Sequence, residues 1–423
     1  MPPLTQYDLG KLGVNVDSSP IHKLDGELSR AQNAIRNTKG VDGGITNRGG
    51  YSNLNGTATG GSVLGGIGVP LGDGPGSGSD IRRIYIPSIN TGASFAGWIY
   101  SDDDFTTAQV DSKIAAPGFP GTGFYFAAVA NNKLFYLKNN GFATATQVVR
   151  SYNGRTDYEA STLLPSGLLV GPTAFAVLDG QLYLTTLDSG TSDADWVGRV
   201  FRMDTETGHL TQIGPAFPTG YIPTTLALYQ NDLYVGGTRA TNTNLARIYK
   251  IRPDVENSWT NDETMSTGIY AINHLYRWGA YLYVATSATD AGNASVLRRS
   301  IDGSYTAVLT PGNVGVATGQ FGLNFAEFGG YLYVSWYDGN ISDAFYRSST
   351  GAAASWSALT EPVGGLTYFV ASPTALFSLG VSDNNIYKST NGTSFGAAIN
   401  LSTLTGQTIA SLYVALRLDV VNL

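Results

Sequence analysis

A pair of residues, an aliphatic one followed by an aromatic one, returns along this chain at a nearly constant spacing of roughly 50 residues. The seven copies are Ile84-Tyr85, Leu134-Phe135, Leu182-Tyr183, Leu233-Tyr234, Leu282-Tyr283, Leu332-Tyr333 and Leu376-Phe377. A fixed period of this length is typical of repeat proteins, in which each copy is one supersecondary unit that cannot bury its apolar face alone. The repeat therefore constrains the fold more than any single motif does.

The residues around each pair predict a β-hairpin. In the third copy, the apolar residues 173–178 lead into Asp179-Gly180, and a second apolar run follows over 181–184. Asp-Gly between two such runs is the strongest short hairpin signal. The same place in other copies holds Asn131-Asn132, Asn231-Asp232, Trp278-Gly279 and Gly329-Gly330. Most of these residues tolerate a positive φ or bond locally through their side chains, so turn chemistry recurs with the repeat.

A later strand of the repeat alternates apolar residues with basic or polar ones. Its copies are Ile99-Tyr100, Phe201-Arg202, Tyr249-Lys250, Leu297-Arg298, Phe345-Tyr346-Arg347 and Ile386-Tyr387-Lys388. Alternation at period two indicates a strand with one packed face and one solvated face. The second copy, around residues 144–150, matches this pattern poorly.

Polar turns that contain glycine follow several of these strands, and they resemble known propeller motifs. Residues 300–305, 348–351 and 389–395 resemble a shortened Asp-box, the turn of sialidase-type propellers, and residues 233–237 resemble a Kelch strand. Four short strands per unit and seven units predict an all-β fold, a seven-bladed β-propeller of four-stranded antiparallel blades over residues 59–407. We expect the aliphatic and aromatic residues of the repeat to pack between adjacent blades rather than to bind a ligand.

Composition agrees with this fold and excludes several kinds of chemistry. Gly provides 53 of the 423 residues and charged residues only 13%, as many tight turns and uncharged polar strands would produce. The chain has no cysteine, and His22, His209 and His274 lack the paired spacing of a metal site. We predict no catalytic, cofactor-binding or metal-binding residues. Calcium in the loop Asp102-Asp103-Asp104 is left open, although adjacent carboxylates lack the alternating spacing of a calcium loop.

The two ends of the chain carry no copy of the repeat. Residues 1–58 are predicted to form a separate amino-terminal arm or platform segment, in which residues 25–35 are expected to form a short helix with Asp25 as its N-cap. Residues 408–423 form a long apolar tract of strand character. This carboxy-terminal strand either closes the propeller ring or pairs with the arm, because an uncovered apolar strand invites aggregation.

The arm contains four short runs that together resemble a known family. They are residues 13–17, 24–28, 31–34 and 45–51, with the sequences GVNVD, LDGEL, AQNA and ITNRGGY. These runs resemble the opening of tailed-bacteriophage virion proteins, and the nearest type is the tail hub or nozzle protein of short-tailed phages. The resemblance covers about 40 residues by motif and the rest by architecture, and Arg48-Gly49-Gly50 departs from the Lys-Arg-Pro-Gly text of that family.

This resemblance implies a structural protein of the virion tail, synthesised in the host cytoplasm. The ends of the chain would build a homo-oligomeric ring that extends the DNA ejection channel, and it would dock the portal-proximal adaptor and other tail proteins. A net charge of −7 does not favour gripping phosphate, so genome DNA is expected to pass through the lumen without specific binding. We expect no membrane span, and the first residues lack the features of a signal peptide.

A glycan-binding or sialidase-like propeller is the alternative. Glycosidases need a carboxylate pair at a suitable separation, or a Tyr nucleophile with an Arg cluster. The acidic residues fall mostly in predicted loops, where solvated surface is the simpler interpretation: Asp102, Asp103, Asp104, Asp111, Asp188, Asp193, Asp195, Glu206, Asp254, Glu256, Asp262, Glu263 and Asp383. We therefore predict that the chain is not an enzyme.

Overall fold

The structure, a computed structural model, describes separate strands between residues 34 and 188 together with Thr106, and longer stretches from residue 195 to residue 400. The longer stretches are 195–239, 246–266, 268–288, 294–310, 321–337, 344–360, 366–371, 374–380 and 385–400. The chain divides into two compact units, Met1–Arg82 with Asn422–Leu423, and Arg83–Val421. Each unit is described by itself.

In the first unit, β1 (Ala34–Arg36) pairs with β2 (Ile45–Asn47) in an antiparallel hairpin. The prediction of a helix over residues 25–35 is wrong where it can be compared, because Ala34 and Ile35 lie in β1. Backbone bonding to β2 outweighs the weak helical periodicity of this short segment, since a helix this short is marginal without packing. The rest of the predicted helix lies outside the described residues, and so does the tract 408–423.

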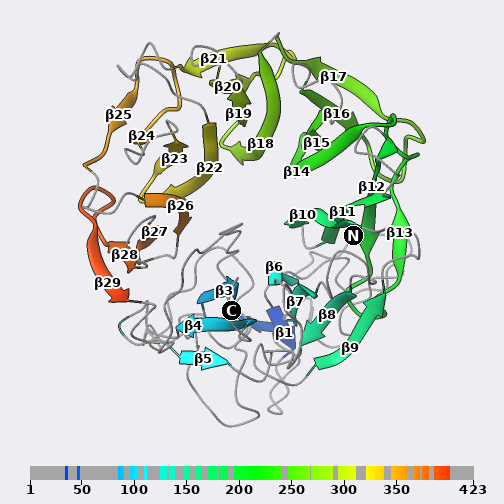
Figure 1. The fold of residues 1–423 in the computed structure, drawn as a ribbon, viewed down its shortest axis with the longest axis horizontal. Helices are drawn as coiled ribbons and strands as arrows, with labels where there is room; N and C mark the ends of the chain where they lie inside the picture. Colours follow the sequence, from blue (N-terminus) through cyan, green and yellow to red (C-terminus); the bar gives the residue numbers. More distant parts are fainter. Residues whose placement is uncertain are drawn as a thin grey trace, which may run out of the picture. The chain divides into compact units, whose positions relative to one another are not determined.

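The second unit is built from antiparallel β-strands, and its strands fall into sets of three or four that are consecutive in the chain (Figure 1). The first sets are β3 (Ile84–Ile89), β4 (Ala96–Ser101) and β5 (Gln109–Asp111); and β6 (Phe124–Ala130), β7 (Lys133–Lys138), β8 (Gln147–Ser151) and β9 (Tyr158–Leu163). Next come β10 (Val170–Leu178), β11 (Gln181–Asp188), β12 (Val197–Met203) and β13 (Leu210–Gln212); and β14 (Tyr221–Tyr229), β15 (Asp232–Arg239), β16 (Arg247–Ile251) and β17 (Thr260–Thr264). The last are β18 (Ile269–Trp278), β19 (Tyr281–Ala288), β20 (Val296–Arg299) and β21 (Tyr305–Leu309); β22 (Phe321–Phe328), β23 (Tyr331–Tyr337), β24 (Ala344–Ser348) and β25 (Trp356–Ala358); and β26 (Leu366–Ala371), β27 (Leu376–Gly380), β28 (Asn385–Ser389) and β29 (Gly396–Asn400).

The all-β character and the four-stranded antiparallel sets are confirmed, but not every set is a separate sheet. β10–β17 form one sheet of eight strands and β18–β25 form another. Each joins two four-stranded sets through a single residue pair, Val197 with Tyr221 in the first and Ser287 with Phe321 in the second. No sheet among the described residues closes on itself.

The repeated aliphatic–aromatic pair lies on the second strand of each four-stranded set. Leu182, Leu233, Leu282, Leu332 and Leu376 are all 0% exposed. The aromatic partner belongs to a cluster that spans two consecutive sets, as Tyr234 packs with Ile272 of β18 and Tyr333 packs with Phe369 of β26. The predicted role of the pair, packing between neighbouring four-stranded sets, is confirmed. The poorly matching residues 144–150 nonetheless overlap a strand, β8.

The hairpin turns between the first two strands of each set follow the predicted chemistry with small shifts in position. Gly329-Gly330 forms its turn as expected, with φ of +59° and +79°. In the β14–β15 hairpin, Tyr229 pairs with Asp232, so the turn consists of Gln230 and Asn231, with φ of +53° and +68°. This turn begins one residue before the predicted pair, Asn231-Asp232. Positive φ at both turn positions matches the right-handed twist of the flanking strands.

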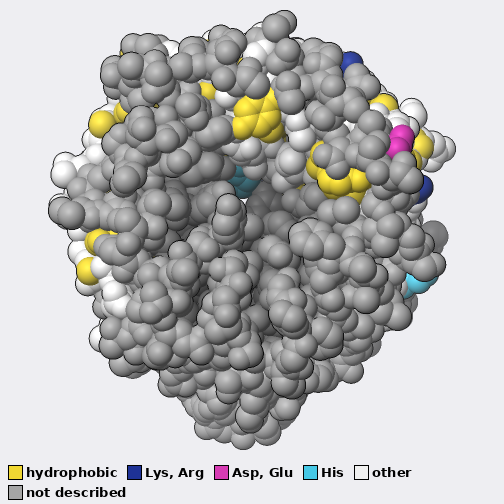
Figure 2. All heavy atoms as spheres, viewed as in Figure 1, with side chains coloured by type: hydrophobic (Ala, Val, Ile, Leu, Met, Phe, Trp, Pro, Cys, Tyr) yellow, Lys and Arg dark blue, Asp and Glu magenta, His cyan; other side chains and the backbone are white. Residues whose placement is uncertain are grey.

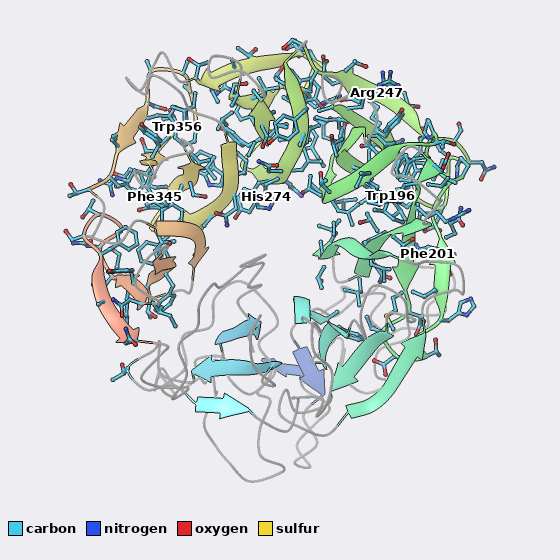
Figure 3. All side chains as sticks on the ribbon, viewed as in Figure 1. Trp196, Phe201, Arg247, His274, Phe345 and Trp356 are labelled. Carbon is cyan, nitrogen blue, oxygen red and sulfur yellow. The ribbon has the colours of Figure 1, made fainter. Side chains whose placement is uncertain are left out.

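A polar side chain at one position of the first strand joins a set to the next at three successive junctions, from the β14–β17 set to the β26–β29 set. Thr225 Oγ1 accepts a hydrogen bond from the backbone N–H of Leu275 at 3.0 Å, His274 Nδ1 accepts one from Phe325 at 2.9 Å, and Asn324 Oδ1 accepts one from Phe369 at 3.0 Å. We call Thr225, His274 and Asn324 the inter-set acceptors. Figure 3 shows His274 on β18. Each acceptor lies at a β-bulge of its strand, which turns the side chain toward the following set.

Candidate functional site

The strongest candidate site is a cleft of about 860 Å³ between the β10–β13 and β14–β17 sets. Three turns supply half of the lining residues, those between β12 and β13, β14 and β15, and β16 and β17, and the strands beside them supply the rest. The residues that line it are Leu178, Gln181, Tyr183, Arg202, Asp204, Thr207, His209, Thr211, Leu228, Asn231, Pro253 and Asp254. Loop-rich ends of stacked sheets are common places for binding sites, because loops tolerate varied side chains on a rigid frame.

An ion pair bridges the two sets at this cleft. The Arg202 guanidinium binds Asp254 in a bidentate manner, with Nη1 to Oδ2 at 2.5 Å and Nη2 to Oδ1 at 3.0 Å. This hydrogen bond raises the pKa of Arg202 above its ordinary value and lowers the pKa of Asp254. The Asp254 side chain is 62% exposed, so solvent screens the pair and its contribution to stability is small. Its effect is to hold the two turns in register.

A second carboxylate in the cleft organises its own turn. Asp204 Oδ1 accepts hydrogen bonds from the backbone N–H groups of Thr207 and Glu206, at 2.7 and 2.9 Å, and from Thr207 Oγ1 at 2.9 Å. These bonds, led by the Thr207 backbone, lower the pKa of Asp204. The turn ends at Gly208, with φ of +76°. His209 follows and lines the same cleft.

The turns predicted to resemble an Asp-box share this construction. Asp302 Oδ1 accepts bonds from the backbone and side chain of Ser304, and from the Ser300 hydroxyl, which lower the pKa of Asp302 to about 2 with the Ser300 bond as the largest cause. Asn391 Oδ1 accepts from the backbone of Thr393 and Ser394, both at 2.9 Å. These side chains stabilise turns, and the same chemistry recurs at Asp204.

A second charged cluster lies between the β14–β17 and β18–β21 sets and is buried. Asp262 binds Arg299 at 2.7 Å and Lys250 at 2.8 Å, and it accepts a bond from the Tyr305 hydroxyl at 2.7 Å. Burial raises the pKa of Asp262, but the bonds from Arg299, Lys250 and Tyr305 outweigh burial and lower it. The Asp262 and Arg299 side chains are 6% and 5% exposed, so this cluster joins two sets and offers little surface to a ligand.

The structure corrects the prediction for Asp262 and confirms the prediction for Asp254. Asp262, predicted to lie on solvated loop surface, is in strand β17 within a buried network. Asp254 lies in an exposed turn as predicted, and it also bridges two sets at the cleft. His209, which was set aside, lines that cleft, whereas His274 supports the neighbouring strand. The residues Asp102, Asp103 and Asp104 lie outside the described residues.

The charged residues of the described stretches are sparse on the face drawn in Figure 2, where they lie toward the outer edge. In the part of the chain that the structure describes, no group of three or more His, Asp or Glu side chains is placed to hold a metal ion. No helix among these residues is long and apolar enough to cross a membrane.

Comparison with known proteins gives a likeness of fold. No family model matches the chain, and no curated protein matches it. Puromycin hydrolase is similar in structure, with a TM-score of 0.54, 10% identity, and coverage of 75% of this chain and 52% of that one. A prolyl endopeptidase has a TM-score of 0.51 at 13% identity, covering 75% of this chain and 50% of the peptidase. A putative 6-phosphogluconolactonase from Bacteroides uniformis has a TM-score of 0.52 at 14% identity, covering 75% and 95%.

These neighbours define the class, an all-β protein of propeller-like architecture, and they correct one prediction. The sequence was interpreted as that of a protein that is not an enzyme, but its structural neighbours are hydrolases and a putative lactonase, so that prediction is wrong for this fold. The chain spans about half the length of the prolyl endopeptidase and of puromycin hydrolase. At 10–14% identity the likeness shows the fold alone, and no substrate or reaction is carried over.

Proposed function

We propose that this chain is a seven-bladed β-propeller that serves as a structural component of a bacteriophage tail, of the hub or nozzle type. The single observation that carries the proposal is the repeated linkage between four consecutive four-stranded sets, from β14–β17 to β26–β29. Thr225, His274 and Asn324 make equivalent bonds at three successive junctions, and aromatic side chains of the repeat pack across them. Packed and hydrogen-bonded junctions of this kind resist deformation, as a tail part under load requires.

The contacts between consecutive sets support the proposed number of blades. β6, β10, β14, β18, β22 and β26 are each the first strand of a four-stranded set, and consecutive members of this series contact one another. The β3–β5 set begins with the strand that carries Ile84-Tyr85, which is the second strand elsewhere, so its first strand is missing from the described residues. We infer that residues 408–421 supply that strand and close a ring of seven blades.

The tail assignment is supported by the resemblance of the arm to tail proteins of short-tailed phages. In this proposal the arm and its counterparts in neighbouring copies form the oligomeric ring, and the propeller projects from it. The chain carries a net charge of −7, so a lumen lined by it would repel DNA weakly and let the genome pass. Adaptor and other tail proteins are the expected partners.

Fractionated phage particles test the proposal directly. We expect mass spectrometry to find this polypeptide in the tail fraction and not in the capsid fraction. Electron microscopy of the same tails should show a ring of propellers at the channel. A polypeptide that is absent from purified tails, or that is purified as a monomer and never recovered in particles, contradicts the assignment.

A further inference from the structure

We propose that the cleft between the β10–β13 and β14–β17 sets binds a neutral, hydroxyl-rich saccharide. This inference goes beyond the tail assignment and does not depend on it. The volume of about 860 Å³ lies within the usual range of small-molecule sites. The bidentate pair of Arg202 and Asp254 links the two walls of the cleft.

The polar lining suits hydroxyl groups. Gln181 and Asn231 contribute amides, and Thr211 contributes a hydroxyl, whereas the Thr207 hydroxyl is already bonded to Asp204 and to the His209 N–H. The two amides and the Thr211 hydroxyl can each both donate and accept a hydrogen bond, as each sugar hydroxyl can. A ligand that alternates donors and acceptors along its length therefore meets matching partners on both walls.

The apolar lining suits the other property of a sugar ring. Leu178, Leu228 and Pro253 line the cleft together with the ring of Tyr183. The carbon-bound hydrogens of a pyranose form an apolar face, and burial of that face against such side chains is favourable. A small inorganic ion or a fully charged ligand would make no use of these residues.

The charges of the cleft favour a neutral ligand over an acidic one. Arg202 is already paired with Asp254, and Asp204 adds a further negative charge whose Oδ1 is occupied by its own turn. A sialic acid carboxylate would have to displace Asp254 from Arg202 in the presence of Asp204, which like-charge repulsion disfavours. The cleft thus differs from a sialidase site, which needs free arginines for the substrate carboxylate.

Titration calorimetry on the purified full chain tests the proposal with defined probes. The neutral arm uses hexasaccharides of glucose, mannose, galactose and N-acetylglucosamine, and the acidic arm uses sialyllactose. We expect saturable binding of at least one neutral hexasaccharide and weaker binding of sialyllactose. The intact polysaccharide of the same sugar, presented on beads, then distinguishes a cell-surface source from a free oligosaccharide, because only the former retains the protein.

Two variants of one turn localise the binding. Asn231→Gly removes the amide from the cleft while keeping the turn, because Gly330 occupies the corresponding position of the β22–β23 turn with a similar positive φ. Gln230→Gly makes the same kind of change at the adjacent position, which does not line the cleft. We expect about tenfold weaker binding for Asn231→Gly and unchanged binding for Gln230→Gly.

Three outcomes overturn the proposal. They are the absence of saturable binding to every neutral hexasaccharide, tighter binding of sialyllactose, and equal binding by Asn231→Gly and the unchanged chain. None of them affects the test of the tail assignment, which is read from phage particles.

Discussion

At the scale of single residues, the contact between Gly392 and Tyr333 is one of the tightest between neighbouring sets. Gly392 has φ of +71°, and a Cβ at this position would lie 2.1 Å from the Tyr333 hydroxyl oxygen, which donates a hydrogen bond to the Gly392 carbonyl at 3.1 Å. The change Gly392→Ala would put an alanine in the left-handed region of backbone conformation, and its Cβ would displace the Tyr333 side chain. We expect a loss of about 2–4 kcal/mol of unfolding free energy, measured by urea denaturation.

Gly330→Ala is the matched control for that change. Gly330 has φ of +79°, but its added Cβ would meet no atom within 4 Å, so only the backbone strain of about 1–2 kcal/mol remains. A double variant that also carries Tyr333→Phe should recover part of the Gly392→Ala loss. Equal losses for the two glycine changes would show that the steric contact with Tyr333 is unimportant.

The buried Asp262 cluster predicts a pH dependence of stability. The pKa of Asp262 is lowered in the folded protein, so its ionised form contributes stability that is complete above the unfolded pKa of about 3.9. That contribution is lost as the pH falls through the folded pKa. Asp262→Asn leaves Arg299 and Lys250 without their shared partner, and we expect a loss of about 3–5 kcal/mol at pH 7 that shrinks below about pH 4.

Asp254→Asn provides the comparison, since Asp254 is 62% exposed and its pair with Arg202 is screened by solvent. We expect at most about 1 kcal/mol for this change. Urea titrations of both variants and of the unchanged chain at a series of pH values measure the difference. A constant gap between Asp262→Asn and the unchanged chain across the acid range would contradict the proposed role of the ionised carboxylate.

At the scale of elements, the inter-set acceptors are interchangeable in chemistry, and this makes a prediction. His274 accepts from the Phe325 N–H, and Asn324 does the same work one set later. His274→Asn keeps an acceptor and should change stability by less than about 1 kcal/mol, whereas His274→Leu leaves a buried N–H unpaired and should cost about 1–3 kcal/mol. Amide hydrogen exchange at Phe325 measures the protection that this hydrogen bond gives. Equal exchange rates in the two variants would show that the side chain at position 274 does not protect the Phe325 N–H.

The sequence pattern predicted the second and third strands of each set well and the first strand's bonding poorly. The aliphatic–aromatic pair and the basic residue of the next strand recur in similar form, and the structure pairs them directly, as with Tyr234 and Lys250. Thr225, His274 and Asn324 share a position and a role but no residue type, so a search for repeated letters misses them. What they share is an acceptor atom at a bulge.

The sequence pattern did not predict the cleft, for a related reason. Arg202 and Asp254 are 52 positions apart, close to one repeat, so each looks like a surface residue of its own unit. Their contact arises only when consecutive sets stack. A search for opposite charges one repeat apart, rather than for similar residues, would have predicted the contact between Arg202 and Asp254. It would not have predicted that His209 and Asn231 line the same cleft.

At the scale of the whole molecule, the described sets account for the fold but not for its function. The fold is shared with hydrolases at 10–14% identity, and folds of this kind host unrelated activities. What distinguishes this chain must therefore lie in its cleft, its turns and its arm. The arm carries the resemblance to tail proteins, and the cleft carries the inferred saccharide site, so the two proposals depend on separate parts of the chain.

Closure of the propeller is the last prediction, and it concerns residues 408–421. The second compact unit extends to Val421, and among the described residues the β3–β5 set has three strands where the other sets have four. If this tract supplies the fourth strand, its removal leaves the edge of β3 unpaired and opens the body between β26 and β3.

We expect deletion of residues 408–423 to lower the free energy of unfolding by on the order of 5 kcal/mol or more, since a row of backbone bonds at about 1 kcal/mol each is lost together with apolar burial. Deletion of residues 422–423 alone is the control and should have little effect. Thermal unfolding and exchange protection of Ile84 to Ile86 measure the outcome, and a synthetic peptide of residues 408–421 should restore both. A truncated chain that unfolds like the intact one would place the closing strand elsewhere.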